Sequence, residues 1–534
     1  MPGPNVDLFR DSFYDVKGPV GGIARAAPKL NFVEPPARLP TPKEKESTGF
    51  AATSFAPKRS RKLGGHLALH LGKHRRMSRI IAGVFCSISC FAVSLHAEPQ
   101  DSFSQAHNSA QQTNATQPPR RALPAPLDGI FPSSEYLGPT PLIGVPDTDP
   151  VWPLTKALWD ASPTFKKTKI KVYGWLNPGG DASTSGDSNI PESYAIVPNK
   201  LEMDQAVLRF DRIPDSFQTN HMDWGFRLTI LYGIDYRWTT AQGWFSEQLL
   251  RRNSLYGADP LEVYGLLYFP HVAQGMMLKI GRYISTPDIE AQFAPDNYLF
   301  THSLTFTYDC FTQTGVNAAI KLNQHYTVLF GIHAGSDVAP WNAAAHPSGL
   351  LMLRWVSQSN NDSLYGGIDS INSGRFKDEH YNLQQSNLTW THRFNQRGTF
   401  LTSTEGYYIY QSNALVGGTI NNGPPRPWFK LTGPGAPIQG NAPAVGVVNY
   451  TAIKLGKKDF LTLRPIDFLV DIKGQRTGFA TTLASWTVGV THRFSDLFAV
   501  RPEIRYEYAF SARPWDNGLK NRQIMFAIDA IIRF

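Results

Sequence analysis

The sequence predicts an all-β fold, a closed antiparallel transmembrane β-barrel of about sixteen strands with a disordered N-terminal region. Three observations predict it. Apolar and polar residues alternate with a period of two from Lys169 onward, the connections between these segments are long and short by turns, and the final segment carries an unbroken apolar row. In this chain of 534 residues, 12% aromatic and only 18% charged residues agree with lipid-facing rows of side chains.

The N-terminal part predicts secretion. Residues 1–76 are basic, rich in Pro, Gly and Ala, and without periodicity, so we expect a disordered extension. Arginines at 75–79 then precede an apolar run at 80–95 and a small residue, Ala97. This order is typical of a signal peptide over residues 77–97, because the run is too short for a membrane helix. An N-terminal membrane anchor is the alternative.

Met77 stands directly before this signal, so we expect translation to start there and residues 1–76 to come from an upstream start; an extended signal is the alternative. Residues 1–97 carry 15 of the 52 basic residues and six of the 43 acidic ones. The mature chain is therefore neutral, and the basic precursor gives no reason to expect nucleic-acid binding.

Residues 98–165 begin with a Gln/Asn/Ser/Thr tract and then become rich in proline. This composition predicts a disordered periplasmic segment, with order only near Trp152 to Trp159. The barrel is expected over residues 166–534. The mature chain keeps one cysteine, Cys310, which cannot form an internal disulfide and is interpreted as a small packing residue.

Residues 223–237 show the alternation most clearly. One face carries Trp224, Phe226, Leu228, Ile230, Tyr232, Ile234 and Tyr236, and the other is largely polar. Because successive side chains of a strand point to opposite faces, one face would meet lipid and the other water. Strands of a soluble sandwich also alternate, but these rows are longer and end in aromatic residues, as membrane strands do. No later apolar run is long enough for a membrane helix, so a closed barrel is the expected spanning structure.

Sixteen segments are predicted as strands, with ends uncertain by about two to four residues. They are 169–176, 201–212, 222–237, 261–269, 275–284, 314–322, 325–334, 349–358, 363–372, 384–394, 398–410, 445–455, 459–472, 483–494, 498–511 and 522–534. Long connections alternate with short turns such as 323–324 and 395–397. Outer-membrane barrels have long external loops and short periplasmic turns, so both termini are expected in the periplasm.

The last segment predicts an assembly signal. Its apolar row is formed by Phe526, Ile528, Ala530, Ile532 and Phe534. A row that ends on an aromatic residue resembles the signal read by the outer-membrane barrel assembly machinery.

Five short motifs occur in order along the chain. They are 143–150 (IGVPDTDP), 231–237 (LYGIDYR), 279–283 (KIGRY), 314–316 (TGV) and 501–506 (RPEIRY). These motifs resemble the OmpL-like β-barrel porin family of Gram-negative bacteria. Their order along residues 140–534 carries the resemblance. It implies a passive pore in the outer membrane of a Gram-negative bacterium. A Pro/Gly-rich insertion at 412–444 departs from the family pattern, and its role is not assigned.

The polar face of the predicted strands supplies the candidate pore-lining residues. They are Asp223, Arg227, Asp235, Arg237, Arg501, Glu503, Arg505 and Glu507. A sixteen-stranded barrel is too wide for side chains to fill, so these charges would screen small solutes by charge and size. Cross-strand ion pairs that stabilise the wall are the alternative, and both can hold. The long segment 285–313 is a candidate constriction loop, with Asp288, Glu290 and Asp296 facing wall arginines.

The leading functional hypothesis is a porin for small hydrophilic solutes, without cofactor or metal. A surface receptor or adhesin that acts through its long loops is the alternative from another class. A barrel enzyme is the third, but the sequence has no GxSxG, HExxH, Walker or GxGxxG motif. Expected partners are outer-membrane lipid, lipopolysaccharide and the assembly machinery, and sixteen-stranded porins suggest a homotrimer by analogy.

Overall fold

The computed structural model describes residues 143–144, 150–191, 194–252, 254–286, 289–373, 382–395, 398–412, 414, 438–475 and 477–534. The predicted N-terminal extension at 1–76 and the signal peptide at 77–97 lie outside these residues. Most of the segment 98–165 lies outside them as well.

The described residues form sixteen strands, the predicted number, and each predicted segment corresponds to one of them. They are β1 (Lys171–Ser183), β2 (Leu201–Arg212), β3 (Asp223–Gly233), β4 (Gly257–Phe269), β5 (Met276–Ile284), β6 (Thr312–Lys321), β7 (Tyr326–Ser336), β8 (Ser348–Val356), β9 (Asp362–Ile371), β10 (Gln384–Arg393), β11 (Phe400–Ser412), β12 (Asn441–Lys454), β13 (Asp459–Asp471), β14 (Thr481–Ser495), β15 (Phe498–Ala509) and β16 (Arg522–Arg533).

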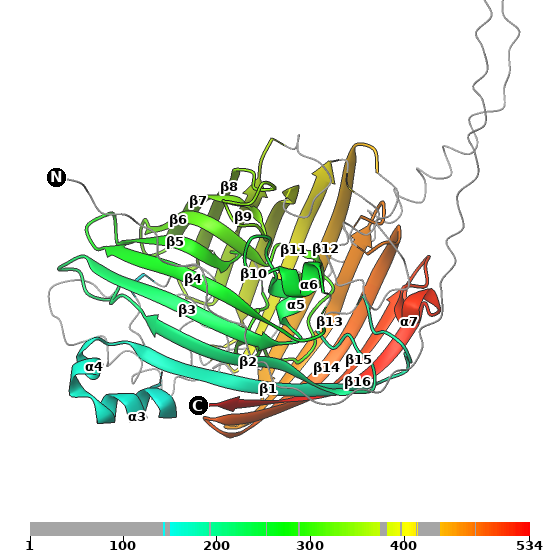
Figure 1. Cartoon of the computed structure of the whole chain (residues 1–534), viewed down its shortest axis with the longest axis horizontal. Coiled ribbons are helices and arrows are strands. Elements are labelled where there is room, and N and C mark those ends of the chain that lie inside the picture. Colours follow the sequence, from blue (N-terminus) through cyan, green and yellow to red (C-terminus); the bar gives the residue numbers. More distant parts are fainter. Residues whose placement is uncertain are drawn as a thin grey trace, which may run out of the picture. The chain divides into compact units, whose positions relative to one another are not determined.

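The strands close into one antiparallel barrel in which each strand pairs with its sequence neighbours and β1 pairs with β16. Figure 1 shows the ring, with β1 in cyan beside β16 in red. The closure includes Phe534, whose backbone N–H donates to Gly174 O at 3.1 Å while Gly174 N–H donates to Phe534 O at 3.2 Å. A side chain at Gly174 would collide with the Phe534 ring and with Val207 O, so this position needs glycine. The predicted closed barrel is confirmed.

The alternation of the sequence becomes an alternation of inner and outer faces. On β16, Phe526, Ile528 and Ile532 are exposed on the outer face, whereas Met525 and Asp529 are buried on the inner face. Exposed apolar side chains on other strands, such as Ile280 of β5, Leu351 of β8 and Ile504 of β15, belong to the surface that a bilayer would cover.

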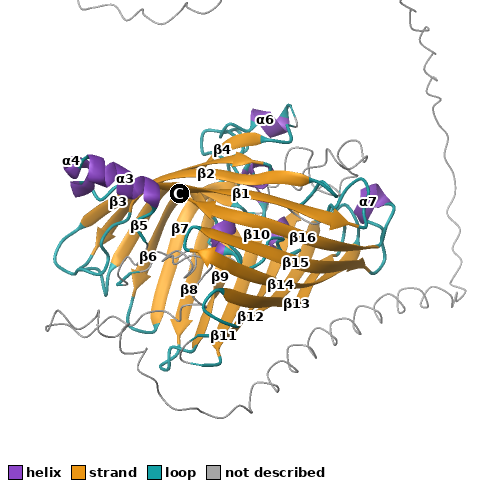
Figure 2. Cartoon of the chain, turned by 90° about the horizontal axis from the view of Figure 1, so that it is seen from below, coloured by secondary structure: helices purple, strands orange, loops and turns teal. Residues whose placement is uncertain are grey.

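The connections alternate as predicted. Short turns such as 455–458 and 496–497 lie at one end, called here the short-turn end, and long connections such as 234–256 and 285–311 lie at the other, the long-loop end. Helices α3 (Pro153–Ala161) and α4 (Pro163–Lys167) lie beside the short-turn end, and α7 (Trp515–Gly518) lies at the long-loop end (Figure 2). No helix in the part of the chain that the structure describes is long and apolar enough to cross a membrane.

Within the segment 98–165 order was expected only near Trp152 to Trp159, and the structure describes helices there and in the residues that follow. Helices α3 and α4 occupy most of 153–167, and Thr155 is buried, donating to Val172 O at 2.6 Å and accepting from Val172 N–H at 2.8 Å. Trp152 is also buried, under the Arg533 guanidinium at 4.3 Å from its ring centroid. Proline at the first helical position starts each helix, which explains how a Pro-rich segment becomes helical here.

The prediction of one strand over 222–237 is wrong at its end. Strand β3 stops at Gly233, where φ is +154° and a Cβ would collide with Asp204 O. The chain then turns into α5 (Tyr236–Thr239). Apolar residues that the alternation assigned to lipid, among them Ile234, are instead buried in a cluster at this end of the barrel.

Cys310 is a free, fully buried cysteine that packs with Leu304 and Leu383, as predicted. The insertion predicted over 412–444 is shorter than expected, because β12 begins at Asn441. Residues 413 and 415–437 of that insertion lie outside the described residues.

Candidate pore constriction

The connection between β5 and β6 is hydrogen-bonded to the inner wall of the barrel. This inner loop, defined as residues 285–311, includes two short 3-10 turns, η2 (Ala294–Asp296) and η3 (Phe306–Tyr308). An irregular backbone can be buried only where its N–H and C=O groups find partners. The inner wall supplies these partners through charged side chains of β13 and β15.

Arg501 on β15 holds one turn of the inner loop. Its Nη1 donates to the carbonyl oxygens of Ala294 at 3.0 Å, Asn297 at 2.8 Å and Leu299 at 2.8 Å. Its Nε donates to Asp529 Oδ1 on β16 at 2.9 Å. The guanidinium thus joins two wall strands to three loop carbonyls in one fully buried group.

Glu503, two residues further along β15, accepts from the same loop. The backbone N–H of Phe300 donates to Glu503 Oε2 at 2.8 Å, and the N–H of Thr301 lies 3.3 Å from both carboxylate oxygens. Arg505 then donates to the carbonyl of His302 and forms an ion pair with Glu507 at 2.8 Å. Every second residue of β15 therefore binds the loop: Arg501 and Arg505 donate to loop carbonyls, and Glu503 between them accepts from loop N–H groups.

Strand β13 adds a second row of contacts. Arg464 Nη1 donates to Thr301 O at 2.8 Å, and the N–H of Leu304 donates to Asp467 Oδ1 at 2.9 Å. Strict alternation would place Arg464 and Asp467 on opposite faces of the strand. The β13–β14 register shifts between Arg464 and Phe468, and both side chains are fully buried inside. This irregularity explains why sequence reasoning missed them.

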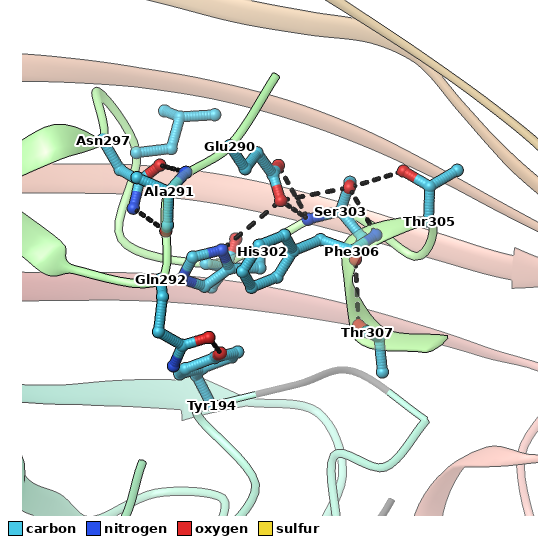
Figure 3. A network of polar contacts seen from close by, with 12 residues as sticks. Tyr194, Glu290, Ala291, Gln292, Asn297, His302, Ser303, Thr305, Phe306 and Thr307 are labelled. Carbon is cyan, nitrogen blue, oxygen red and sulfur yellow. Dashed lines mark hydrogen bonds and ion pairs between the residues drawn. The ribbon is translucent and has the colours of Figure 1, made fainter. Parts of the chain in front are cut away.

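A carboxylate of the loop itself forms the centre of a third network. Glu290 accepts from Ser303 N–H at 3.0 Å and from Ser303 Oγ at 3.1 Å, and lies 3.3 Å from His302 Nδ1 (Figure 3). Arg464 Nη1 is 3.5 Å from Glu290, and Tyr450 of β12 donates to it. Glu290 therefore ties two parts of the loop to β12 and β13.

Burial and neighbouring charge set the ionisation of this network. Burial acts to raise the pKa of Glu290. That pKa is nevertheless below its ordinary value, because Glu290 is hydrogen-bonded to His302 and to the Ser303 N–H and lies near the charges of His302 and Arg464. Burial lowers the pKa of His302, against the opposing effect of Glu290. At neutral pH the loop therefore carries a carboxylate beside a neutral imidazole.

The loop is also attached far from β13 and β15. Near its start, Thr286 Oγ1 donates to Asp369 Oδ1 on β9 at 2.6 Å. In its middle, Ala294 N–H donates to Gln205 Oε1 on β2 at 3.1 Å, and Gln205 Nε2 donates to Gln292 O at 3.0 Å. Contacts with β2, β9, β12, β13 and β15 mean that the loop crosses the barrel interior.

The predicted site residues fall into three groups. Arg501, Glu503 and Arg505 lie on the inner wall and are bonded to the inner loop, and Glu507 is buried beside Arg505, so the four do not face open water. Asp223 and Arg227 are also inside and form ion pairs with Arg212 at 2.9 Å and Asp211 at 2.8 Å. Because Asp211 and Arg227 are cross-strand partners, this pair stabilises the wall.

Asp235 and Arg237 are not on a wall strand, because β3 ends before them. Asp235 is buried and accepts from Gln205 Nε2 at 2.8 Å, and Arg237 donates to Ser254 O from helix α5. Of the predicted constriction residues, Glu290 and Asp296 lie in the inner loop and are buried, whereas Asp288 lies outside the described residues.

One further buried ion pair could not be predicted from the sequence, because alternation places both residues on the inner face without showing that they pair. Arg209 of β2 forms an ion pair with Glu262 of β4 at 3.1 Å, and its guanidinium lies 4.6 Å from the Phe293 ring centroid of the inner loop. Both residues sit on the inner face of predicted strands. Their pairing across β3 depends on register, which a single sequence does not reveal.

A closed sixteen-stranded antiparallel barrel with short turns at one end, long loops at the other and a polar interior is the architecture of an outer-membrane porin. The sequence comparison agrees. The chain belongs to the family described as putative beta-barrel porin-2, OmpL-like, whose family model matches residues 169–534. The resemblance predicted from short motifs is therefore confirmed, and the protein is an outer-membrane β-barrel of the porin class.

The chain has low similarity to three of the solved structures that match it. Salmonella typhi OmpF in complex with daunomycin has 9% identity and a TM-score of 0.41, over 68% of this chain and 97% of that one. The outer membrane channel DcaP of Acinetobacter baumannii has 10% identity and a TM-score of 0.39, over 68% and 97%. OmpT of Vibrio cholerae in its trimer form has 11% identity and a TM-score of 0.40, over 68% and 99%. No curated protein matches the chain.

Proposed function

We propose that the protein is a passive diffusion channel through which small hydrophilic solutes cross the outer membrane in a water-filled lumen. A sixteen-stranded barrel is too wide for its own side chains to fill. The observation that carries the proposal is the inner loop, which is attached at β2, β9, β12, β13 and β15 by buried hydrogen bonds. A segment held across the interior in this way sets the width of the passage.

A catalytic role is not part of this proposal. Glu290, His302 and Ser303 are the residue types of a hydrolase triad. However, Ser303 and His302 both contact Glu290 rather than each other, and all three are buried. The hydroxyl is therefore hydrogen-bonded to the carboxylate and not to the imidazole as in such a triad, and the cluster ties two parts of the loop together.

The location and orientation of the channel are part of the proposal. We propose that residues 77–97 direct secretion, that the barrel lies in the outer membrane of a Gram-negative bacterium among lipid and lipopolysaccharide, and that the short-turn end faces the periplasm. By analogy with sixteen-stranded porins we expect a homotrimer, which light scattering of the detergent-solubilised protein measures.

Conductance in planar lipid bilayers tests the channel. The purified protein is expected to insert with discrete, long-lived current steps. A correctly folded protein that gives no steps would contradict the proposal and favour a receptor or adhesin with an occluded lumen.

A further inference from the structure

A row of apolar side chains lies on the inner wall of the barrel near the short-turn end. Tyr268 of β4 opposes Asp223, which is on the inner face, and directly opposed residues of neighbouring strands point to the same face. Successive cross-strand pairs from β4 to β8 continue this inner apolar row, which consists of Tyr268, Met277, Ala319, Leu329 and Met352. All five side chains are at most 3% exposed. Since the interior of a water-filled barrel is polar, a buried apolar row on the inner wall needs a cover.

Ile143, from the part of the chain before the barrel, packs against this row. It is 4% exposed and belongs to the same buried cluster as all five residues of the inner apolar row. The turn between β4 and β5 also approaches it closely, because a Cβ at Gly275 would lie only 2.5 Å from Ile143 Cγ2. The absence of a side chain at Gly275 therefore leaves the space that Ile143 fills.

Hydrogen bonds fix the backbone at Ile143 and Gly144 from two sides. The N–H of Gly144 donates to the backbone oxygen of Ser216, in the connection between β2 and β3, at 3.1 Å. The ammonium of Lys321, at the end of β6, donates to Ile143 O at 3.1 Å, and a charged donor makes this a strong hydrogen bond. Strands β3, β4 and β5 separate the two partners. Two neighbouring residues therefore bridge distant parts of the rim at the short-turn end.

A second attachment to the interior follows at Trp152. This side chain is buried in a cluster that includes Trp175 of β1 and Phe293 of the inner loop. Arg533 of β16, which opposes Trp175, lies over the Trp152 ring. Connecting segments ordinarily run over the surface of a protein. The described residues before β1 are instead attached inside the barrel at two places, one on β4 to β8 and one on β1 and β16.

We propose that the inner apolar row is a docking surface for the chain's own residues Ile143 and Gly144, which narrow the passage at the short-turn end. The occupant belongs to this chain because the apolar contacts and both hydrogen bonds involve this one dipeptide. The narrowing rests on the proposed channel function, whereas the docking does not depend on it. Ile143 and Gly144 also begin the motif at 143–150, so the docking gives the start of that motif a role in the barrel.

Thiol labelling of the purified barrel in detergent, with a maleimide reagent, tests the docking. The thiol of Ile143→Cys should react about ten-fold more slowly than that of Val151→Cys, because a buried group reacts only after local opening. Val151 is the matched control, since it is a β-branched residue before the barrel and is 44% exposed. The wild-type protein, in which Cys310 is buried, gives the background rate. Equal labelling rates for the two variants would overturn the docking.

Single-channel conductance tests the narrowing. Ile143→Gln places a polar amide against the inner apolar row, so it should release the dipeptide and give larger current steps than the wild type. Val151→Gln, the exposed counterpart, should leave the steps unchanged. Steps of equal size in the wild type and in Ile143→Gln would overturn the narrowing and leave the channel function intact. Absence of any steps from the wild type would contradict the channel function itself, and the labelling rates would still decide the docking.

Discussion

At the residue scale, the inner loop depends on a few buried charges that each satisfy several partners. Arg501 donates to three loop carbonyls and to Asp529, and Glu503 accepts two loop N–H groups. Both positions were predicted to face the lumen from alternation alone. The inner loop that covers them could not be predicted in detail, because its contacts join residues about 200 positions apart.

Arg501→Gln should destabilise the protein by about 3 kcal/mol, because it leaves a buried carboxylate and loop carbonyls without their charged donor. Denaturant unfolding in detergent measures the loss. Arg522→Gln, an exposed arginine at the other end of β16, is the control and should change the free energy of unfolding by less than about 0.5 kcal/mol. Equal effects of the two substitutions would show that Arg501 does not anchor the loop.

Acid should loosen the inner loop. Since burial lowers the pKa of His302 in the folded protein, its contribution to stability is present above the ordinary value of 6.5 and declines as the pH falls below it. The lowered pKa of Glu290 adds a second loss below its ordinary value of 4.5. Protease cleavage within residues 285–311 should therefore increase between pH 7.5 and pH 4.

His302→Gln should remove the part of this pH dependence that begins near 6.5, and it should also weaken the part due to Glu290, because His302 helps to hold the pKa of Glu290 below its ordinary value. An unchanged profile in the variant would assign the transition to another group.

At the scale of elements, the sequence predicted where strands occur, but it did not predict where a strand ends early or becomes irregular. Strand β2 has the predicted bounds, and all sixteen segments became strands. The prediction was wrong where the chain breaks its period: at Gly233, where β3 ends at a close backbone approach, and at the β13 irregularity that places Arg464 and Asp467 on one face. Periodicity assumes a regular strand, so a bulge or an early turn shifts every later residue.

Strand β16 carries the proposed assembly signal. Its outward row of Phe526, Ile528 and Ile532 continues to Phe534, which pairs with Gly174 of β1. Phe534→Ser should reduce the amount of barrel in the outer membrane several-fold, measured by membrane fractionation. Leu519→Ser, an exposed apolar residue outside the strand, is the control. Equal membrane levels for Phe534→Ser and wild type would argue against the signal.

At the scale of the whole molecule, closure of the barrel brings together the charges that hold the inner loop. These charges lie on the inner faces of β13, β15 and β16. Composition could not reveal this arrangement, because the chain after residue 97 is neutral as a whole. Only closure of the barrel and the register of its strands bring these residues to one place.

The central claim is that a water-filled lumen is narrowed by the inner loop. Single-channel conductance of the wild type and of a variant lacking residues 288–296 tests it most directly. The wild type should conduct in discrete steps, and the deletion should give clearly larger steps because it removes loop backbone from the interior. Equal conductance in the two proteins, with both folded as barrels, would contradict the claim.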